Sequence, residues 1–238
     1  LAVRFVEEGW SLKAMHRLIM LSDVYQRSSG FSPRNDTADQ DNQFYWRYDI
    51  RRLEAEVIRD ALLALSGTLD RTLGGSLLEV KNRAYLFDHT SNDKSSYDIR
   101  RRSIYVPVIR NHLYDMFQLF DYTDASVLNG NRDTSTIAPQ ALFLMNSQLV
   151  ASLTTAMAKR LLEAEGTREG RINQLFMEAY GRQPTADELN RADVFLSRFE
   201  KLTVQDKDGT KDGADSTQQA WQALCQSVIL SSEFIYVR

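Results

Sequence analysis

The sequence has one cysteine, no excess of charge and no long apolar run, and each shortage excludes a class of protein. Because Cys225 is the single cysteine among 238 residues, no disulfide framework can form within the chain. The 29 basic and 32 acidic residues give a formal net charge of -3, so no overall field attracts nucleic acid or an anionic membrane. No apolar run approaches the roughly 18–20 residues of a membrane span. We therefore expect neither a nucleic-acid partner nor a membrane span.

Motifs of the common catalytic and cofactor sites are absent as well. The sequence contains no HExxH, CxxC or CxxCH, so we expect no metal site and no covalent haem within this chain. It also lacks GxSxG, a Walker-type glycine loop and GxGxxG, which leaves any catalytic residues unknown. His89, flanked by Asp88 and Asp93, fits a solvated loop better than a weak metal site. Glu54 and Glu56 stand two positions apart, which on a helix turns them to different faces and makes them a poor acid–base pair.

Apolar residues recur at helical spacing through most of the chain. In "RRLEAEVIRDALLALSG", Leu53, Val57 and Ala61 share one face, and Gly67 is a natural stop. The stretch "PTADEL" contains the S/T-x-x-E capping box that opens a helix. We predict a single, mainly α-helical domain over residues 1–238 with about six to eight helices.

Two segments interrupt this pattern. Between about residues 67 and 112 the helical period disappears, over a length too great for an idle connection in a compact domain. Its centre, "RRSIYVPVIRN", is apolar and β-prone with Pro107 in the middle. We predict an irregular multi-helix bundle with a long central loop or extended insertion over about residues 67–112 and at most a short strand, at 104–108. The charged, glycine-containing segment 204–216 is predicted to be a mobile loop.

Arginine is concentrated in and beside the central loops. Its planar guanidinium binds carboxylate, sulfate and phosphate groups through paired hydrogen bonds, so the cluster fits an anion-recognition surface. The alternative is structural, because irregular backbone needs donors for its carbonyl groups and aspartates such as Asp121 and Asp133 stand nearby. The cluster consists of Arg100, Arg101, Arg102, Arg110 and Arg132.

Several stretches together resemble a known family. They are "SLKAMHRLIMLSDVYQRSS", "NQFYWRYDIRRLEAEVIRDALLALSG", "RRSIYVPVIRN" followed by "LFDYTDAS", "RDTSTIAPQALFLMNSQLV", "GRQPTADEL" and "LCQSVILSSEFIYVR". In this order they are similar to the domain of unknown function 1553 family, a C-terminal domain of planctomycete proteins that carry cytochrome-c-like modules. The resemblance covers nearly the whole chain. It implies no established activity, so no catalytic residue is carried over.

The resemblance implies a setting and a set of signature positions. The setting is a large exported protein, periplasmic or secreted, with a haem-binding cytochrome c-type module upstream, of which this chain is a C-terminal fragment. Short polar side chains at Asn146 and Ser147 favour a helix bend, whereas the absence of the proline that often follows Asn-Ser in the family predicts a straighter helix. The signature positions are Arg101, Arg102, Ser103, Tyr105, Pro107, Arg110, Asn111, Arg132, Thr136, Pro139, Gln140 and Asn146.

Two hypotheses for function follow, with a purely architectural role as a third. The first is a non-catalytic interaction or scaffold module of an exported multidomain protein, which binds a neighbouring domain or an anionic glycan through its arginine-rich loops. The second is an enzyme that acts on polysaccharide or works with the upstream haem module, with a site around Arg101, Tyr105, Arg110, His112 and Asp133. The candidate ligand or structural-tie residues are Arg101, Arg102, Tyr105, Arg110, Asn111, His112, Arg132, Asp133, Gln140 and Asn146.

Overall fold

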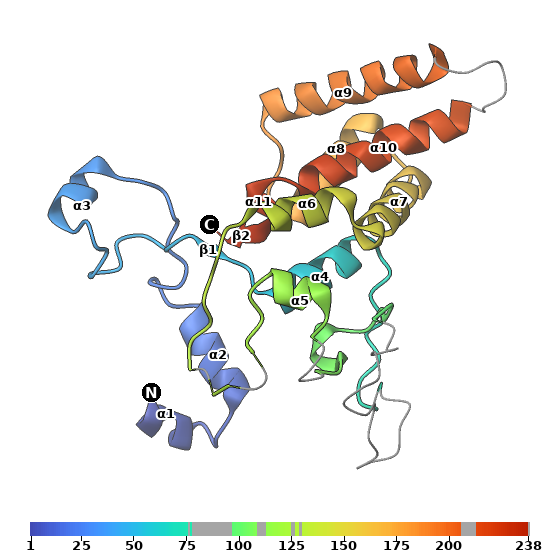
Figure 1. Ribbon diagram of the computed structural model, residues 1–238. Coiled ribbons are helices and arrows are strands. Elements are labelled where there is room, and N and C mark those ends of the chain that lie inside the picture. The colour runs from blue at the N-terminus through green and yellow to red at the C-terminus, as the bar shows by residue number, and fades with distance from the viewer. Residues whose placement is uncertain are drawn as a thin grey trace. The chain divides into compact units, whose positions relative to one another are not determined.

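Helix ends in this protein lie where local chemistry favours them. The structure, a computed structural model, describes residues 1–75, 77, 97–108, 113–124, 127–128, 130–205 and 213–237, without the side chains of 203–205 and 213–215. The helix α8 (Arg168–Tyr180) begins after Thr167, whose hydroxyl accepts a hydrogen bond from the N–H of Gly170. It ends at Gly181, which has a left-handed φ of 71° that favours glycine. The predicted mainly α-helical fold is confirmed (Figure 1).

The described residues form eleven α-helices, more than the six to eight expected. Four of them, α1, α3, α5 and α11, have only four to six residues, which is too short to show a helical period in the sequence. The helices are α1 (Ala2–Glu7), α2 (Leu12–Met20), α3 (Pro33–Ala38), α4 (Ala55–Leu65), α5 (Asp115–Leu119), α6 (Ala138–Asn146), α7 (Gln148–Glu163), α8, α9 (Ala186–Gln205), α10 (Gly213–Ile229) and α11 (Ser232–Ile235).

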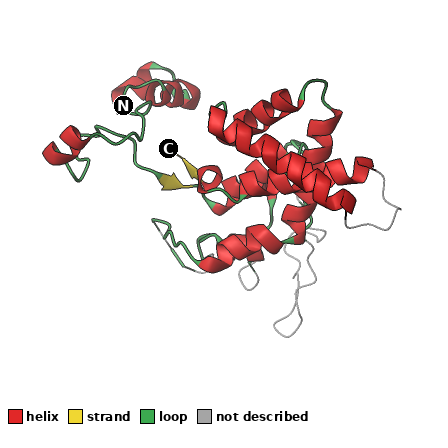
Figure 2. Cartoon of the chain, turned by 90° about the horizontal axis from the view of Figure 1, so that it is seen from above, coloured by secondary structure: helices red, strands yellow, loops and turns green. Residues whose placement is uncertain are grey.

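The chain divides into two compact units. The first unit comprises residues 1–52 and 236–238, and the second unit comprises residues 53–235. In the first unit the strands β1 (Arg51–Arg52) and β2 (Tyr236–Val237) pair antiparallel, with Arg51 opposite Val237 (Figure 2). The prediction of one domain over residues 1–238 stays a prediction.

Polar contacts order the loop of the first unit that follows α3. The buried Asn42 side chain donates hydrogen bonds to the carbonyl of Arg47 and to the Asp49 carboxylate, both at 3.0 Å. The Asp39 carboxylate accepts hydrogen bonds from the N–H groups of Gln43 and Phe44, each at 2.8 Å. These side chains fix the path of the loop where no regular backbone ladder does so.

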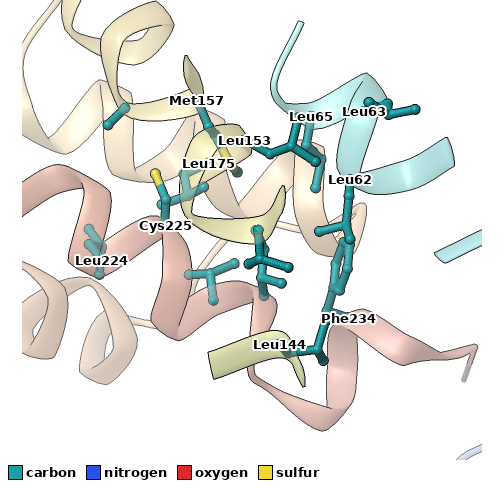
Figure 3. Close-up of a cluster of buried hydrophobic side chains, with 14 of the residues drawn as sticks. Leu62, Leu63, Leu65, Leu144, Leu153, Met157, Leu175, Leu224, Cys225 and Phe234 are labelled. Carbon is teal, nitrogen blue, oxygen red and sulfur yellow. The ribbon is translucent and has the colours of Figure 1, made fainter. Parts of the chain in front are cut away.

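The second unit is built around a helical core in which α7 packs along α10, and α10 along α9. Leu153, Met157 and Leu161 recur every four residues on α7, so one face of that helix is buried. Figure 3 shows Leu62 of α4 and Cys225 of α10 in the same cluster. Burying each large apolar side chain contributes about 1.5–3 kcal/mol, so this face stabilises the unit.

The short strand predicted at 104–108 is wrong. Residues Ser103–Tyr105 form a 3₁₀ turn instead, and Ser103 and Val106 are buried while Ile104 is 83% exposed. That spacing of three is the period of a 3₁₀ turn rather than of a strand. Proline lacks a backbone donor, so Pro107 also disfavours a ladder here. Residues 78–96 and 109–112 of the central region lie outside the described part.

Two other expectations are corrected at helix boundaries. Helices occupy both ends of the loop predicted at 204–216, because α9 continues to Gln205 and α10 begins at Gly213; residues 206–212 lie outside the described part. The bend near Asn146 is confirmed and the straighter helix is wrong. Ser147 has an extended ψ of 131°, which separates α6 from α7 at an angle of 52°.

No single helix in the described ranges combines the length and the apolar character needed to cross a membrane. Taken together, the bent pair α6–α7 has the length and the apolar composition of a membrane span. In α7 the apolar residues that produce this result include Val150, Leu153 and Leu161, which are buried in the core of the second unit.

Replacing Leu153 by alanine tests the core. Leu153 is 1% exposed, so Leu153→Ala should lower the free energy of unfolding by about 2–5 kcal/mol, measured by urea denaturation. The adjacent Ser152 is exposed and bonds only locally, to the carbonyl of Leu149, so Ser152→Ala is the matched control and should change stability by less than about 0.5 kcal/mol. Similar effects of the two substitutions would contradict this description of the core.

Candidate functional site

Arg59 lies at the centre of the arginine-rich region, although it belongs to a helix rather than to a loop. On α4 it stands between Ile58 and Leu62 in the buried stripe, so its side chain is forced inward and is 2% exposed. Its Nη1 donates to the carbonyl oxygen of Arg101 at 2.9 Å and to the Ser103 hydroxyl at 3.2 Å, and its Nη2 donates to the carbonyl of Ile99. One guanidinium therefore holds the segment 99–103 against α4.

The neighbouring Asp60 completes this contact from the acceptor side. Its Oδ1 accepts hydrogen bonds from the N–H of Ser103 at 2.8 Å and from the Ser103 hydroxyl at 2.6 Å. It also lies 3.6 Å from Nη1 of Arg59. Two successive residues of α4 thus supply a cation and an anion to one stretch of irregular backbone, which satisfies the polar groups of that stretch.

The electrostatics of this contact reflect burial. Burial lowers the pKa of Arg59, and the nearby Tyr114 and Asp60 oppose that shift. Burial likewise raises the pKa of the Tyr114 hydroxyl, which is hydrogen-bonded to Arg59. A desolvated cation is costly unless its donors are occupied, so losing the partners of Arg59 would destabilise the fold.

Arg101 holds a second layer of the central region. Its Nη2 donates to the carbonyls of Thr72 at 2.9 Å and Gly74 at 2.5 Å, and its guanidinium lies 4.1 Å from the centre of the Tyr105 ring. The Tyr105 hydroxyl accepts a hydrogen bond from the N–H of Gly74 at 3.0 Å. The backbones of Asp70 and Arg101 also pair in an isolated parallel β-bridge. The guanidinium of Arg101, which the sequence predicted as a candidate for anion binding, thus contacts backbone carbonyls and an aromatic ring of this chain.

Arg132 pairs with glutamates rather than with the aspartates considered from the sequence. It forms a two-pronged contact with Glu56, at 2.7 and 2.8 Å, and a third bond to Glu54 at 3.2 Å. The reasoning that Glu54 and Glu56 point apart is wrong, because α4 begins at Ala55 and Glu54 has extended backbone. The hydrogen bond to Glu56 raises the pKa of Arg132. Its guanidinium also lies 5.0 Å from the centre of the Tyr122 ring.

Gln140 and Asn146 have structural contacts. Buried Gln140 donates from Nε2 to the carbonyl of Leu119 at 3.0 Å and accepts at Oε1 from the N–H of Ile137 at 3.3 Å, which joins the start of α6 to the end of α5. The exposed Asn146 donates to the carbonyl of Leu142 one turn earlier, at 3.1 Å. All three bonds are internal to the helical scaffold.

The structure does not gather the predicted candidates into one constellation. It brings Arg101 and Tyr105 together. Arg102 and Asp133 are exposed, and their side chains form no hydrogen bond or ion pair within the described part of the chain. Arg110, Asn111 and His112 lie outside the described residues, as does His89. Whether any of these candidates binds a ligand stays a prediction.

Sequence reasoning missed Arg59 and Asp60. The available signal was an arginine inside the apolar stripe of α4, between Ile58 and Leu62, where a charged side chain is rarely placed without partners. The sequence drew attention to arginines in loops, whereas Arg59, which holds the segment 99–103, comes from helix α4.

A second arginine clamp lies at the C-terminal end of α8. Arg182 binds the carboxylate of Glu188 with two bonds of 2.8 and 2.9 Å and that of Glu233 with two bonds of 2.7 Å. Glu188 also accepts from the N–H of Thr185, and the Thr185 hydroxyl accepts from the N–H of Glu188, so the predicted capping box is confirmed. Bonding to Arg182 holds the pKa of Glu188 well below its usual range, at about 2, and raises the pKa of Arg182.

The described residues form neither a metal site nor a site with an activated cysteine nucleophile. No group of three or more His, Cys, Asp or Glu side chains there is placed to hold a metal ion. Cys225 is buried, as its apolar surroundings predict, and burial raises the pKa of its thiol to about 12. The thiolate needed for nucleophilic attack is therefore disfavoured at neutral pH.

Replacing Arg59 tests its role in holding the central backbone. Arg59→Met keeps an apolar stem but removes the donors to two carbonyls, so it should lower the free energy of unfolding by about 3 kcal/mol. Hydrogen exchange of the amides in 97–106 should accelerate more than that of the α7 amides. The control is Arg102→Met at an exposed position, which should stay within about 0.5 kcal/mol. Equal effects at the two positions would refute the assignment.

The Arg182 clamp predicts a pH dependence of stability. Because the folded-state pKa of Glu188 is depressed, its contribution is fully present above the unfolded pKa of about 4.3 and is lost as pH falls towards 2. Urea denaturation should show wild type more stable than Glu188→Gln at pH 6, with the difference shrinking between about pH 5 and 2. In an Arg182→Gln background the same substitution should lose this pH dependence. A difference that does not vary with pH in either background would show that the clamp is not the cause.

Comparison with known proteins bears on the resemblance seen in the sequence. The family described as PSD1, Protein of unknown function (DUF1553), matches residues 1–196, which include Arg59, Arg101 and Arg132. No curated protein and no solved structure matches the chain. Because the family match covers far more than half of the 238 residues, this chain belongs to the DUF1553 family of proteins of unknown function.

Proposed function

We propose that this chain is a non-catalytic interaction module whose first unit docks a folded protein domain. The observation that carries the proposal is the near absence of a core in the first unit. Among its described residues, Met15 is the only buried apolar side chain. The exposed large apolar side chains of this unit are Leu1, Val3, Val6, Trp10, Leu12, Ile19, Met20, Leu21, Val24, Tyr25, Phe31, Phe44, Tyr45, Ile50 and Val237.

A segment of this kind is not stable by itself. Ordering one residue costs about 1–2 kcal/mol of backbone entropy, and domains near this length need a well-buried core, disulfides or metals to fold alone. The contacts of Asn42 and Asp39 shape the loop that follows α3, but polar contacts contribute only about 1 kcal/mol each. A partner that covers the apolar side chains would supply the missing stabilisation.

Backbone strain in the same unit supports a binding role. Trp10 and Tyr45 have left-handed φ values of 62° and 54°, although large side chains rarely adopt them. Both side chains are exposed, so no core packing holds these conformations. Strained residues of this type are concentrated at functional surfaces. Aromatic side chains are also enriched at the centres of protein–protein interfaces.

The arginine-rich loops support a protein partner over an anionic glycan. Arg101 and Arg132 direct their guanidinium groups at carbonyls and carboxylates of this chain, so binding a glycan sulfate or carboxylate there would require breaking these contacts. From the resemblance alone, we further propose that the partner is a neighbouring domain of the same exported polypeptide, outside the cytoplasm and beside a haem module. No observation favours the enzymatic alternative.

Hydrogen exchange tests the docking proposal. In the isolated chain, the amides of residues 1–52 should exchange much faster than those of the second unit, because a unit with few buried apolar side chains unfolds locally at little cost in free energy. Within the full natural polypeptide the same amides should be protected at least about tenfold more. Trp10→Ser combined with Phe44→Ser should remove that gain. Leu202→Ser, at an exposed apolar position of the second unit, is the matched control and should preserve it.

Three results would contradict the proposal. One is protection of residues 1–52 in the isolated chain equal to that of α7. Another is equal protection of residues 1–52 in the isolated chain and in the full polypeptide. The third is a protein that dimerises in sedimentation experiments and gains the protection from a second copy, which would make self-association the function of this surface.

A further inference from the structure

An open cavity of about 330 Å³ lies in the second unit, lined by residues of α8, α9, α10 and α11 and by Ser231. It belongs to neither the arginine-rich region nor the first unit. Its size is at the lower end of the range for small-molecule sites. The lining residues are Phe176, Tyr180, Glu188, Arg191, Ala192, Phe195, Leu224, Ser227, Val228, Ser231 and Glu233.

The cavity follows from the residue types at facing helix positions. Ala192 and Phe195, three residues apart, share one face of α9. Leu224 and Val228, four residues apart, share one face of α10. Ordinary packing would place large side chains at such positions. Here Ala192, Ser227 and Ser231 are small, so the space between the two helices stays open. Aromatic rings of Phe176, Tyr180 and Phe195 form the rest of the apolar wall.

Most polar groups of the wall are already bonded within the protein. The Tyr180 hydroxyl donates to the carbonyl of Val228 at 2.9 Å, and the Ser227 hydroxyl donates to the carbonyl of Leu224 at 2.8 Å. The carboxylates of Glu188 and Glu233 are both held by Arg182. These groups shape the cavity and leave little hydrogen-bonding capacity for a ligand.

Arg191 is the exception. It is exposed on α9, and its side chain forms no hydrogen bond or ion pair with any part of the chain that the structure describes. Its guanidinium therefore keeps a free two-pronged donor face beside an apolar, aromatic space. Carboxylates match that donor face in geometry and charge. Because Arg182 is shared by two carboxylates, the wall also keeps negative charge, which limits the affinity for an anion.

We propose that this cavity binds a small amphipathic carboxylate, with its apolar body among the aromatic side chains and its carboxylate on Arg191. A phenyl ring with a short linker is a suitable body, because it fits within this volume. The affinity is about millimolar, as expected for so small a ligand beside residual negative charge. This role is separate from the docking of a protein by the first unit.

The test uses 3-phenylpropionate and its neutral analogue 3-phenylpropionamide, titrated into the whole chain and followed by ¹H–¹⁵N NMR. The carboxylate should shift the amide signals of Ala192 and Ser227 saturably and bind at least about tenfold more tightly than the amide, a difference of about 1.4 kcal/mol. Arg191→Gln should abolish this preference. Arg198→Gln is the control on the same helix, because Arg198 is exposed and does not line the cavity.

A filled cavity provides the second arm. Ser227→Leu should abolish binding of both compounds, because the larger side chain would occupy the space beside Leu224 and Val228. Ser227 is exposed, so the melting temperature should change little. Should this variant fail to fold, the comparison of Arg191→Gln with Arg198→Gln decides. The proposal is overturned if neither compound binds saturably, if the two bind equally to wild type, or if Arg198→Gln weakens the carboxylate as much as Arg191→Gln.

Discussion

The burial of Arg59 in the apolar stripe of α4 is the constraint on which the arginine-rich region depends. A charged group in that position must find acceptors, because leaving it unpaired costs several kcal/mol. The acceptors it finds are the carbonyls of Ile99 and Arg101 and the hydroxyl of Ser103. The same contacts give the irregular segment the donors that a regular ladder would otherwise supply. The charge and the backbone therefore satisfy one another, and neither arrangement is stable without the other.

Arginine has this role at several places in the second unit. Arg132 joins the start of α4 to the segment before α6, Arg160 of α7 reaches the carbonyl of Leu65 at the end of α4 at 2.8 Å, and Arg182 joins α9 to α11. The planar fork of arginine suits such contacts, because it binds two acceptors in a fixed geometry. Guanidinium groups occupied in this way stabilise the scaffold. Among the described residues, most large apolar side chains of the first unit and the guanidinium of Arg191 are instead exposed, and these are the surfaces for which we propose binding.

The sequence predicted features that depend on neighbouring residues and missed those that depend on distant ones. Helices, the Thr185–Glu188 capping box and the break at Ser147 follow from local periodicity and local side chains. The 3₁₀ turn at Ser103 depends on Asp60, far away in the chain, so a β-prone composition was a poor guide. The relative direction of the Glu54 and Glu56 side chains depends on whether α4 begins before or after Glu54, a boundary that a sequence does not define to one residue. The residues of an amphipathic helix such as α2 likewise do not reveal whether another element covers its apolar face.

The most direct test of the central claim is ¹⁵N NMR of the arginine side chains at low temperature. Because two backbone carbonyls and the hydroxyls of Ser103 and Tyr114 hold the guanidinium of Arg59, its two Nη groups should give separate signals with slow proton exchange. The exposed Arg102 should give one averaged signal, since nothing in the described structure restrains it. An averaged, rapidly exchanging signal from Arg59 like that of Arg102 would show that the buried guanidinium does not hold the central backbone.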